Sequence, residues 1–438
     1  MKALQAWVSF ALVLVTVVAT SPSAAQTSTP PEHWVSAWSA AAHATLPFPG
    51  LPPTPAFENQ TIRMVVRPSV GGERLRILFS NAFGADTLAI GAAHIAITRQ
   101  GVSIVPESDR VLTFGGRTAV SIPAGAPMMS DPVNLKVPAF TELTVSVYLP
   151  DKTAGSTVHF WAQHDTYVSG AGDFTKSADF TEPAISKSWY WLADVEVWSP
   201  AQTATIVTLG DSITDGVGAK QGDYADWPDM LAKRLAAGQT VPQLAVANEG
   251  IGGNRVLHDG AGVSALARLD RDVLAQPGVT DLIVLESIND IGWPHMKPPP
   301  SKDGTAPVET PFAKQYVSAQ DLIAGLQQII DRAHEHGIRV FGGTLTPFEG
   351  ADYYSDEGEV SRQAVNQWIR TRGNFDGFFD FDAAVRDPNH PAKFREDFHS
   401  GDHLHPNAAG YQAMANAIDI SVLRGRAEGA ETKSGQIH

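Results

Sequence analysis

The sequence contains no cysteine among its 438 residues. Without cysteine there is no disulfide framework and no lipid-modified cysteine near the N-terminus, so the folded core must supply the stability. Positive charge is also scarce, because 32 Lys and Arg residues stand against 47 Asp and Glu, for a formal net charge of −15. An acidic chain is a poor partner for nucleic acid or for an anionic membrane surface, and we expect neither partner.

Long apolar runs are absent from the sequence, apart from one near its beginning. There, residues 8–19 are almost wholly apolar, Lys2 precedes them, and small residues at 23–25 suit a cleavage site. This pattern predicts a signal peptide over residues 1–25, and hence a secreted or periplasmic protein with no membrane anchor in its mature form. A membrane anchor is the alternative, although the uncharged stretch 3–20 is barely long enough to span a bilayer.

Apolar residues at every second position characterise the next part of the chain. The stretches 62–66, 75–79 and 143–149 all show this alternation, and Gly or Pro turns separate such stretches. The alternation predicts strands with one packed face and one partly wet face, and no long helical pattern interrupts them. Residues 26–200 are therefore expected to form an all-β domain, a sandwich or a jelly roll.

After residue 200 the pattern changes to buried strands alternating with amphipathic helices. Strands are expected at 204–210, 241–250, 280–287, 338–347 and 377–385, and helices at 227–237, 318–337 and 407–423. The alternation predicts an α/β domain with a parallel sheet over residues 201–425, followed by a flexible tail at 426–438. Two long loops, 293–317 and 349–359, interrupt this domain, and ligands bind where such loops gather at the carboxyl ends of strands.

Ser212 lies in the stretch TLGDSITDG, directly after the first of these buried strands. Such a position presents a side chain at the carboxyl edge of the sheet, near backbone N–H groups that can stabilise an oxyanion. A polar turn or a helix cap is the alternative interpretation. The nucleophile-elbow motif Gly-x-Ser-x-Gly is absent, since Thr214 stands two residues after the serine, and there is no phosphate-binding loop.

Asp402 and His405 lie three residues apart in the stretch GDHLHPNAAGY, just before the last predicted helix. On a tight turn or a first helical turn both could face the same way, so that His405 takes the proton of Ser212 while Asp402 orients its ring. A capped helix start with a surface histidine is one alternative. A metal site is another, formed by His399, Asp402, His403 and His405.

Two further polar stretches follow the predicted second and third strands. NEGIGGN places Gly252 and Gly253 in a turn, and ESIND places Asn289 beside Asp290. A glycine N–H and an asparagine amide can both donate to an oxyanion, although a plain turn and a polar strand end are the simpler interpretations. The serine, the glycine turn, the asparagine and the Asp-x-x-His pair all fall at one sheet edge, which favours a single hydrolytic site.

These four blocks together resemble the SGNH/GDSL hydrolase family: GDSITDG its first block, NEGIGGN its second, ESIND its third and DHLHP its last. The resemblance covers residues 203–425 and implies a three-layer α/β/α, flavodoxin-like fold and the activity of a carboxylic ester hydrolase. It also implies Ser212 as the nucleophile, His405 as its base and Asp402 as the group that orients the base.

By the same resemblance, the oxyanion hole consists of the Ser212 N–H, the Gly253 N–H and the Asn289 side chain, and neither a metal nor an organic cofactor is needed. Asp211 is expected to be structural. One departure concerns Ser287, because the family usually has glycine at that place. A side chain there crowds the site or demands a different backbone angle, which puts the loop around Asn289 in doubt.

The expected reaction is acyl transfer to water through an acyl-enzyme on Ser212. Export and the β-rich region favour a carbohydrate ester as the substrate, so we expect a polysaccharide or small-molecule ester. No broad apolar helix suggests a lipase lid, which favours short acyl groups, acetyl above all. Residues 189–191 could stack on sugar rings or pack in the core, and the loop 293–317, with Trp293 and His295, could form a rim or a solvated insertion. The alternatives are a general short-chain esterase or lipase, an envelope acyltransferase and a non-catalytic glycan-binding protein. The oligomeric state is left open.

Overall fold

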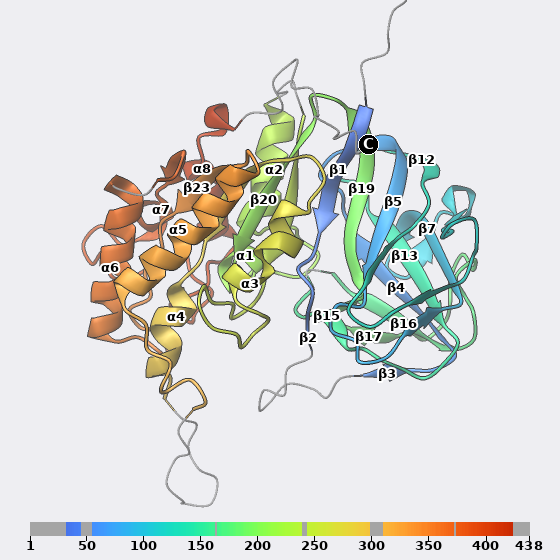
Figure 1. Ribbon diagram of the computed structural model, residues 1–438, viewed down its shortest axis with the longest axis horizontal. Coiled ribbons are helices and arrows are strands. Elements are labelled where there is room, and N and C mark those ends of the chain that lie inside the picture. The colour runs from blue at the N-terminus through green and yellow to red at the C-terminus, as the bar shows by residue number, and fades with distance from the viewer. Residues whose placement is uncertain are drawn as a thin grey trace, which may run out of the picture. The chain divides into compact units, whose positions relative to one another are not determined.

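The chain folds into a β-rich part followed by an α/β part, as Figure 1 shows. The computed structural model describes residues 32–44, 55–162, 164–238, 243–297, 310–371 and 374–423. The predicted signal peptide at 1–25 and tail at 426–438 lie outside these residues. Within the described ranges, no helix has the length and hydropathy needed to cross a membrane.

Two larger antiparallel sheets and three small ones make up the β-rich part. The first sheet contains β1 (Glu32–Ser39), β19 (Leu192–Pro200), β5 (Gly72–Ser80), β11 (Pro127–Met129) and β12 (Val133–Val137). The second contains β17 (Ala184–Ser186), β16 (Thr166–Ala171), β4 (Gln60–Val66), β13 (Leu143–Leu149), β7 (Ala92–Gln100), β8 (Ser103–Ile104) and β9 (Arg110–Val111). The small sheets pair β10 (Val120–Ile122) with β6 (Leu88–Ile90), β14 (Thr153–Ala154) with β3 (Ala56–Phe57), and β15 (Thr157–His159) with β18 (Trp189–Tyr190) and β2 (His43–Ala44).

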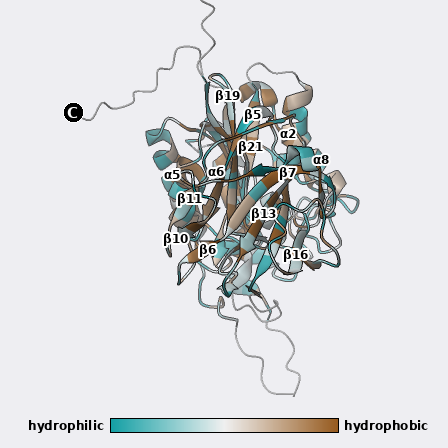
Figure 2. Cartoon of the chain, turned by 90° about the vertical axis from the view of Figure 1, so that its right-hand side faces the viewer, coloured by the Kyte–Doolittle hydropathy of each residue, from teal (hydrophilic) through white to brown (hydrophobic). Residues whose placement is uncertain are grey.

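The two larger sheets share one apolar core, as the alternation in the sequence predicts. Every second residue of β4, β5 and β13 is buried in it: Ile62, Met64, Val66, Leu75, Ile77, Phe79, Leu143, Val145, Val147 and Leu149. The hydropathy of these strands can be followed in Figure 2. The prediction of a β-rich N-terminal region is therefore confirmed, and the two sheets pack on a common core as in a β-sandwich.

The expectation of a partly wet second face is wrong for β4. Arg63 on that face is fully buried, and its guanidinium donates to Ser146 Oγ at 3.1 Å and to the carbonyl oxygens of Val102 at 2.6 Å and Phe174 at 3.1 Å. The ring of Phe180 lies 4.7 Å from the guanidinium carbon. A segment more than 100 residues further along the chain thus covers this face, and local alternation carries no sign of such a cover.

Five parallel strands form the sheet of the α/β part, in the order β21-β20-β22-β23-β24. They are β20 (Ala204–Gly210), β21 (Leu244–Gly250), β22 (Val279–Leu285), β23 (Arg339–Gly343) and β24 (Gly377–Phe379). All residues of β20 are buried, because this strand has neighbours on both sides and helices on both faces. The predicted α/β class with a parallel sheet is confirmed, and its likeness to the flavodoxin fold stays a prediction.

Helices pack on both faces of this sheet (Figure 1). On one face, α2 (Trp227–Ala237), α7 (Phe381–Val385) and α8 (Ala408–Ala417) share a core with Ile206 and Val246. On the other face, α3 (Ala265–Leu269), α5 (Ala319–Glu335) and α6 (Asp356–Thr371) share a core with Val207 and Leu282. The short elements α1 (Ser212–Asp215), α4 (Ile288–Gly292), η1 (Pro106–Ser108), η2 (Asp270–Leu274), η3 (Trp293–His295) and η4 (Ile420–Val422) complete the chain.

Three boundaries differ from those expected from the sequence. The stretch 377–385 is divided into β24 and α7, because the Asp380 side chain caps the helix by accepting from the N–H of Ala383. Helix α8 ends at Ala417 rather than continuing to 423. Helix α6 begins inside the expected loop 349–359, where Ser355 Oγ accepts from the N–H of Gly358 at 3.0 Å.

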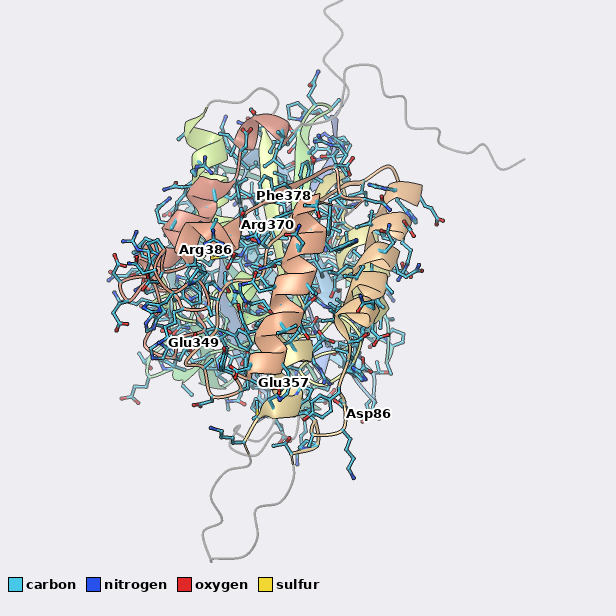
Figure 3. The ribbon with its side chains drawn as sticks, turned by 90° about the vertical axis from the view of Figure 1, so that its left-hand side faces the viewer. Asp86, Glu349, Glu357, Arg370, Phe378 and Arg386 are labelled. Atoms are coloured by element: carbon cyan, nitrogen blue, oxygen red, sulfur yellow. The ribbon has the colours of Figure 1, made fainter. Side chains whose placement is uncertain are left out.

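Helix α6 is fixed to the neighbouring α7 by charge. Arg362 and Arg370 each donate to the buried carboxylate of Asp382, both at 2.7 Å. Figure 3 shows α6 from the outside, with Glu357 near its beginning and Arg370 near its end. A carboxylate that accepts from two guanidinium groups is well compensated for its burial.

Strand β1 connects the β-rich part to the parallel sheet. The Ser36 N–H donates to the Pro277 carbonyl oxygen at 3.0 Å, and Ala40 forms a parallel bridge with Asn248. The described residues of both parts belong to one compact unit, Glu32–His438. The chain changes sheet between β19 and β20, near the predicted boundary of the domains 26–200 and 201–425, and the independence of those two domains stays a prediction.

Candidate active site

Ser212 is the first residue of α1 and directly follows β20 and Asp211. The Asp211 carboxylate accepts from the N–H of Ile213 at 2.9 Å and so caps the short helix. Asp211 is 1% exposed, and burial raises its pKa to about 7. Its side chain is occupied in forming the turn that holds Ser212 at the end of the strand.

His405 connects Ser212 with Asp402. Its Nε2 atom lies 2.8 Å from Ser212 Oγ, and its Nδ1 atom lies 2.6 Å from Asp402 Oδ2. Asp402 Oδ1 also accepts from the backbone N–H groups of Leu404 at 3.0 Å and His405 at 2.9 Å. The pair therefore sits on a tight turn that ends before α8, rather than on a first helical turn.

The ionisation of Asp402 determines which nitrogen of His405 faces the serine. Partial burial by itself raises the pKa of Asp402, but hydrogen bonds from the His405 ring and from two backbone N–H groups hold it well below its usual range. The carboxylate can only accept, so His405 carries hydrogen on Nδ1. In the neutral ring Nε2 is then free of hydrogen and can accept the proton of the Ser212 hydroxyl.

The turn after β21 contains two glycines whose N–H groups differ in use. The Gly252 N–H donates to Asp215 Oδ2 at 3.0 Å, whereas no described residue accepts from the N–H of Gly253. Gly253 has φ +80°, and a Cβ there would lie 2.8 Å from the ring of Trp293. Only glycine suits both the angle and the close approach, and the N–H of Gly253 remains available to a ligand.

Asn289 lies in the first turn of α4 and is held from both ends of its amide. Its Nδ2 donates to the carbonyl oxygen of Asn254 at 3.0 Å, and its Oδ1 accepts from the hydroxyl of Tyr353 at 3.2 Å. The amide has two hydrogens on Nδ2, so one remains for a ligand. The next residue, Asp290, accepts from the N–H groups of Val256 at 2.7 Å and Leu257 at 3.1 Å, which joins the two loops.

Ser287 has a backbone angle that favours glycine, the residue that the family usually has at its place. It has φ 108° and ψ −19°, is completely buried, and its Oγ has no partner among the described residues. Asn289 stays anchored two residues later, but the serine is strained, because its φ lies in a region that side chains rarely adopt. A non-glycine residue in this region costs about 1–3 kcal/mol.

Arg268 and Tyr353, which the sequence patterns do not reveal, support the loops of the candidate site. The guanidinium of Arg268, fully buried, donates to the carbonyl oxygens of Gly210 at 3.0 Å and Glu249 at 2.6 Å, and to Asn254 Oδ1 at 2.9 Å. Tyr353 lies in the expected loop 349–359. The sequence predicts that this loop lies near the site but does not indicate which of its residues takes part. A local partner of Arg268 is Asp272, four positions later at 3.1 Å, and such a pair does not indicate a role at the site, because the three acceptors in the loops lie far from it in the sequence.

Other residues singled out in the sequence are used in packing. The side chains of Trp189, Tyr190 and Trp191 are each less than a tenth exposed and belong to the β-rich core. Trp293 is also buried, against Phe312 at 4.3 Å between ring centroids, so it does not form a rim. Part of the loop 293–317 lies outside the described residues.

The four residues considered as a metal site do not converge. The rings of His399 and His403 contact each other in a tilted arrangement, at 4.4 Å between ring centroids, while His405 is hydrogen-bonded to Ser212 and Asp402. In the described part of the chain, no group of three or more His, Cys, Asp or Glu side chains is placed to hold a metal ion.

The family of this site follows from comparison with known proteins. Residues 208–413 match the model of the GDSL-like lipase/acylhydrolase family, and this range contains all five proposed site residues. Residues 208–413 are a GDSL-like lipase/acylhydrolase domain. The GDSL domain is accordingly a carboxylic ester hydrolase, which confirms the family and the enzyme class expected from the four blocks.

Solved structures similar to this chain have low identity and low TM-scores. An acetylxylan esterase from Geobacillus stearothermophilus is 21% identical, with a TM-score of 0.35, over 50% of this chain and 94% of its own. A protein assigned to the lipolytic G-D-S-L family from Desulfitobacterium hafniense is 18% identical, with a TM-score of 0.35, over 49% of this chain and 97% of its own. A comparison with curated proteins gives no match. No substrate follows from likenesses this low.

The strain at Ser287 predicts a stabilising substitution. We expect Ser287→Gly to exceed Ser287→Ala in free energy of unfolding by about 1 kcal/mol, because both remove the buried hydroxyl but only glycine relieves the positive φ, after allowance for its greater chain entropy. Urea denaturation followed by tryptophan fluorescence measures the difference. An alanine variant as stable as the glycine variant would contradict the strain.

Proposed function

We propose that the protein is a secreted or periplasmic serine ester hydrolase that removes short acyl groups, acetyl above all, from carbohydrate. Its catalytic residues are Ser212, His405 and Asp402. The observation that carries this proposal is the continuous relay from Ser212 Oγ to His405 Nε2 at 2.8 Å and from His405 Nδ1 to Asp402 at 2.6 Å. A serine needs an oriented base of this kind to become a nucleophile at neutral pH.

The reaction proceeds in two halves. Ser212 Oγ attacks the ester carbonyl while its proton passes to His405 Nε2, and the developing oxyanion accepts from the N–H groups of Ser212 and Gly253 and from the Asn289 amide. The alcohol leaves with the proton from His405, and an acyl-enzyme remains. Water then attacks the acyl group through the same base, and the acid and free Ser212 are released.

The packing behind the oxyanion donors supports a short acyl group. The ring of Trp293 lies against Gly253, and the ring of Tyr353 lies so close to Gly292 that a Cβ there would be 2.4 Å from it. Both aromatic side chains are less than a tenth exposed. They fill the space next to Gly253 and Gly292 and leave no room for a long acyl chain at these two positions.

The support for a carbohydrate comes from the other side of the site. The indole of Trp161 is 49% exposed, and it lies against Gly252, one residue from the proposed donor Gly253. A half-exposed aromatic face with a polar edge suits the stacking of a sugar ring. The predicted export would bring the enzyme to polysaccharide outside the cytoplasm.

Serine labelling tests the nucleophile. A fluorophosphonate probe should modify the wild-type protein at Ser212, and Ser212→Ala should lose both the label and ester hydrolysis, because no other group can form the acyl-enzyme. Intact-mass measurement and peptide mapping give the site. Ser121→Ala, on the exposed side of β10, is the control that should label like the wild type. Hydrolysis by Ser212→Ala at the wild-type rate would sink the assignment.

The oxyanion donors predict a graded pair of variants. Asn289→Ala should lower kcat for 4-nitrophenyl acetate about 10²–10³-fold, the usual cost of one oxyanion donor. Tyr353→Phe removes only the hydrogen bond to Asn289 Oδ1, so we expect a smaller loss of about tenfold, with KM little changed. Tyr354→Phe is its matched control, since that hydroxyl bonds to Asp356 instead. Equal activity of Tyr353→Phe and Tyr354→Phe would contradict the proposed orientation of Asn289.

A substrate screen separates the carbohydrate esterase from a general esterase or lipase. We expect the fastest turnover with the acetyl member of a 4-nitrophenyl ester series, and release of acetate from acetylated oligosaccharides. Product analysis with added alcohols distinguishes hydrolysis from acyl transfer. Should every acetylated glycan be inert while simple esters are cleaved well, the carbohydrate preference is wrong and the short-chain esterase remains.

A further inference from the structure

A buried histidine of the β-rich part contacts the element that carries the nucleophile. His159, the last residue of β15, is 5% exposed; its Nε2 lies 3.0 Å from Asp215 Oδ1, and its Nδ1 lies 2.9 Å from the carbonyl oxygen of Ala41. A carboxylate and a carbonyl oxygen both accept, so each ring nitrogen must donate and the ring is an imidazolium. Burial lowers the pKa of His159, whereas the charge and the hydrogen bond of Asp215 raise it. The net result is a pKa above the usual value of histidine.

Asp215 connects His159 with the turn after β21. It is the last residue of α1, three positions after Ser212, and its second carboxylate oxygen accepts from the Gly252 N–H at 3.0 Å. Gly252 precedes Gly253, whose N–H is a proposed oxyanion donor. Two adjacent glycines have no side chains to fix their backbone, so the direction of the Gly253 N–H depends on contacts such as this one.

A second residue of the same segment of the β-rich part lies directly against Gly252. Trp161 follows His159 by two residues, and a Cβ on Gly252 would lie 2.6 Å from its ring. The peptide at Gly252 is thus held by the Asp215 carboxylate and covered by an indole. Both contacts depend on residues 159–161 of the β-rich part, and His159 lies 56 positions before Asp215 in the sequence.

We infer that His159 is a positioning residue for ester hydrolysis: the buried His159–Asp215 pair fixes the Gly252–Gly253 turn so that the Gly253 N–H points to the oxyanion. This inference rests on the proposed function. It gives the β-rich part a role in the reaction, because the oxyanion hole keeps its geometry only while that part is in place.

Substitution of His159 separates positioning from stability alone. His159→Phe removes both donors and should lower kcat for 4-nitrophenyl acetate about tenfold or more, with KM changed less than about twofold, because the transition state loses a donor that the ground state hardly uses. His159→Gln can still donate to Asp215 and should recover most of the loss. kcat is referred to the folded protein, measured by near-UV circular dichroism.

A second buried histidine provides the matched control. His94, on β7, is 3% exposed and pairs with Asp109 through Nδ1 at 3.0 Å. His94→Phe breaks a comparable pair of the β-rich part, and among the described residues no hydrogen bond joins this pair to the turn at Gly252. It should lower the midpoint of urea unfolding and leave kcat of the folded protein unchanged.

The outcomes distinguish this inference from the proposed function. If the wild type cleaves no ester and takes no fluorophosphonate, the proposed function fails. If the wild type is active and folded His159→Phe keeps its kcat, or loses no more than His94→Phe, the pair is merely structural and the inference is overturned. Where His159→Phe does not fold, Asp215→Asn decides, because His159 and Gly252 donate to different carboxylate oxygens and one of these becomes an NH2 group that cannot accept. A lower kcat at unchanged KM supports positioning, and an unchanged kcat overturns it.

Discussion

The hydrogen bond between Ser212 Oγ and His405 Nε2 joins two turns that lie 193 positions apart in the chain. Its length of 2.8 Å depends on how accurately the fold brings those turns together. Helix α8 does this, because it packs beside α2 and because the Tyr411 hydroxyl donates to the carbonyl oxygen of Val217 at 2.6 Å, just after α1. The turn of Asp402 and His405 directly precedes that anchored helix, so packing on one face of the sheet fixes His405 against Ser212.

Buried charge performs the corresponding task for the proposed oxyanion donors. Arg268 donates to carbonyl oxygens at the ends of β20 and β21. Asp290 accepts from the N–H of Val256 in the loop after β21, and Asp215 accepts from the N–H of Gly252. Each of these groups is expensive to bury and is compensated by several hydrogen bonds. Groups fixed in advance need little rearrangement during the reaction, which is the basis of electrostatic stabilisation in enzymes. The strained backbone at Ser287 is tolerated next to these groups, because the contacts around it allow it no other backbone angle.

The sequence predicts those features that depend on neighbouring residues. Period-two and helical patterns located the sheets and α5, and short local blocks located Ser212, Asn289 and the pair Asp402 and His405. Contacts between distant segments produce no such local pattern. The sequence therefore does not reveal the roles of Tyr353, Arg268 and His159, nor the distant segment that buries Arg63. The resemblance implies Gly253 as a donor, and the structure adds a reason to prefer it to Gly252, since the Gly252 N–H already donates to Asp215. Ser287 was recognised as unusual, but only the backbone angle shows how it is accommodated.

The central claim is that one site, assembled from the GDSL blocks and supported by the β-rich part, stabilises an oxyanion next to Ser212. A crystal structure of the protein after reaction with a methyl fluorophosphonate tests it most directly, because the tetrahedral phosphonate resembles the intermediate. The account predicts the adduct on Ser212, with its phosphoryl oxygen accepting from the N–H groups of Ser212 and Gly253 and from Asn289, while Gly252 still donates to Asp215. An adduct on another residue, or a phosphoryl oxygen directed away from Gly253 and Asn289, would contradict it.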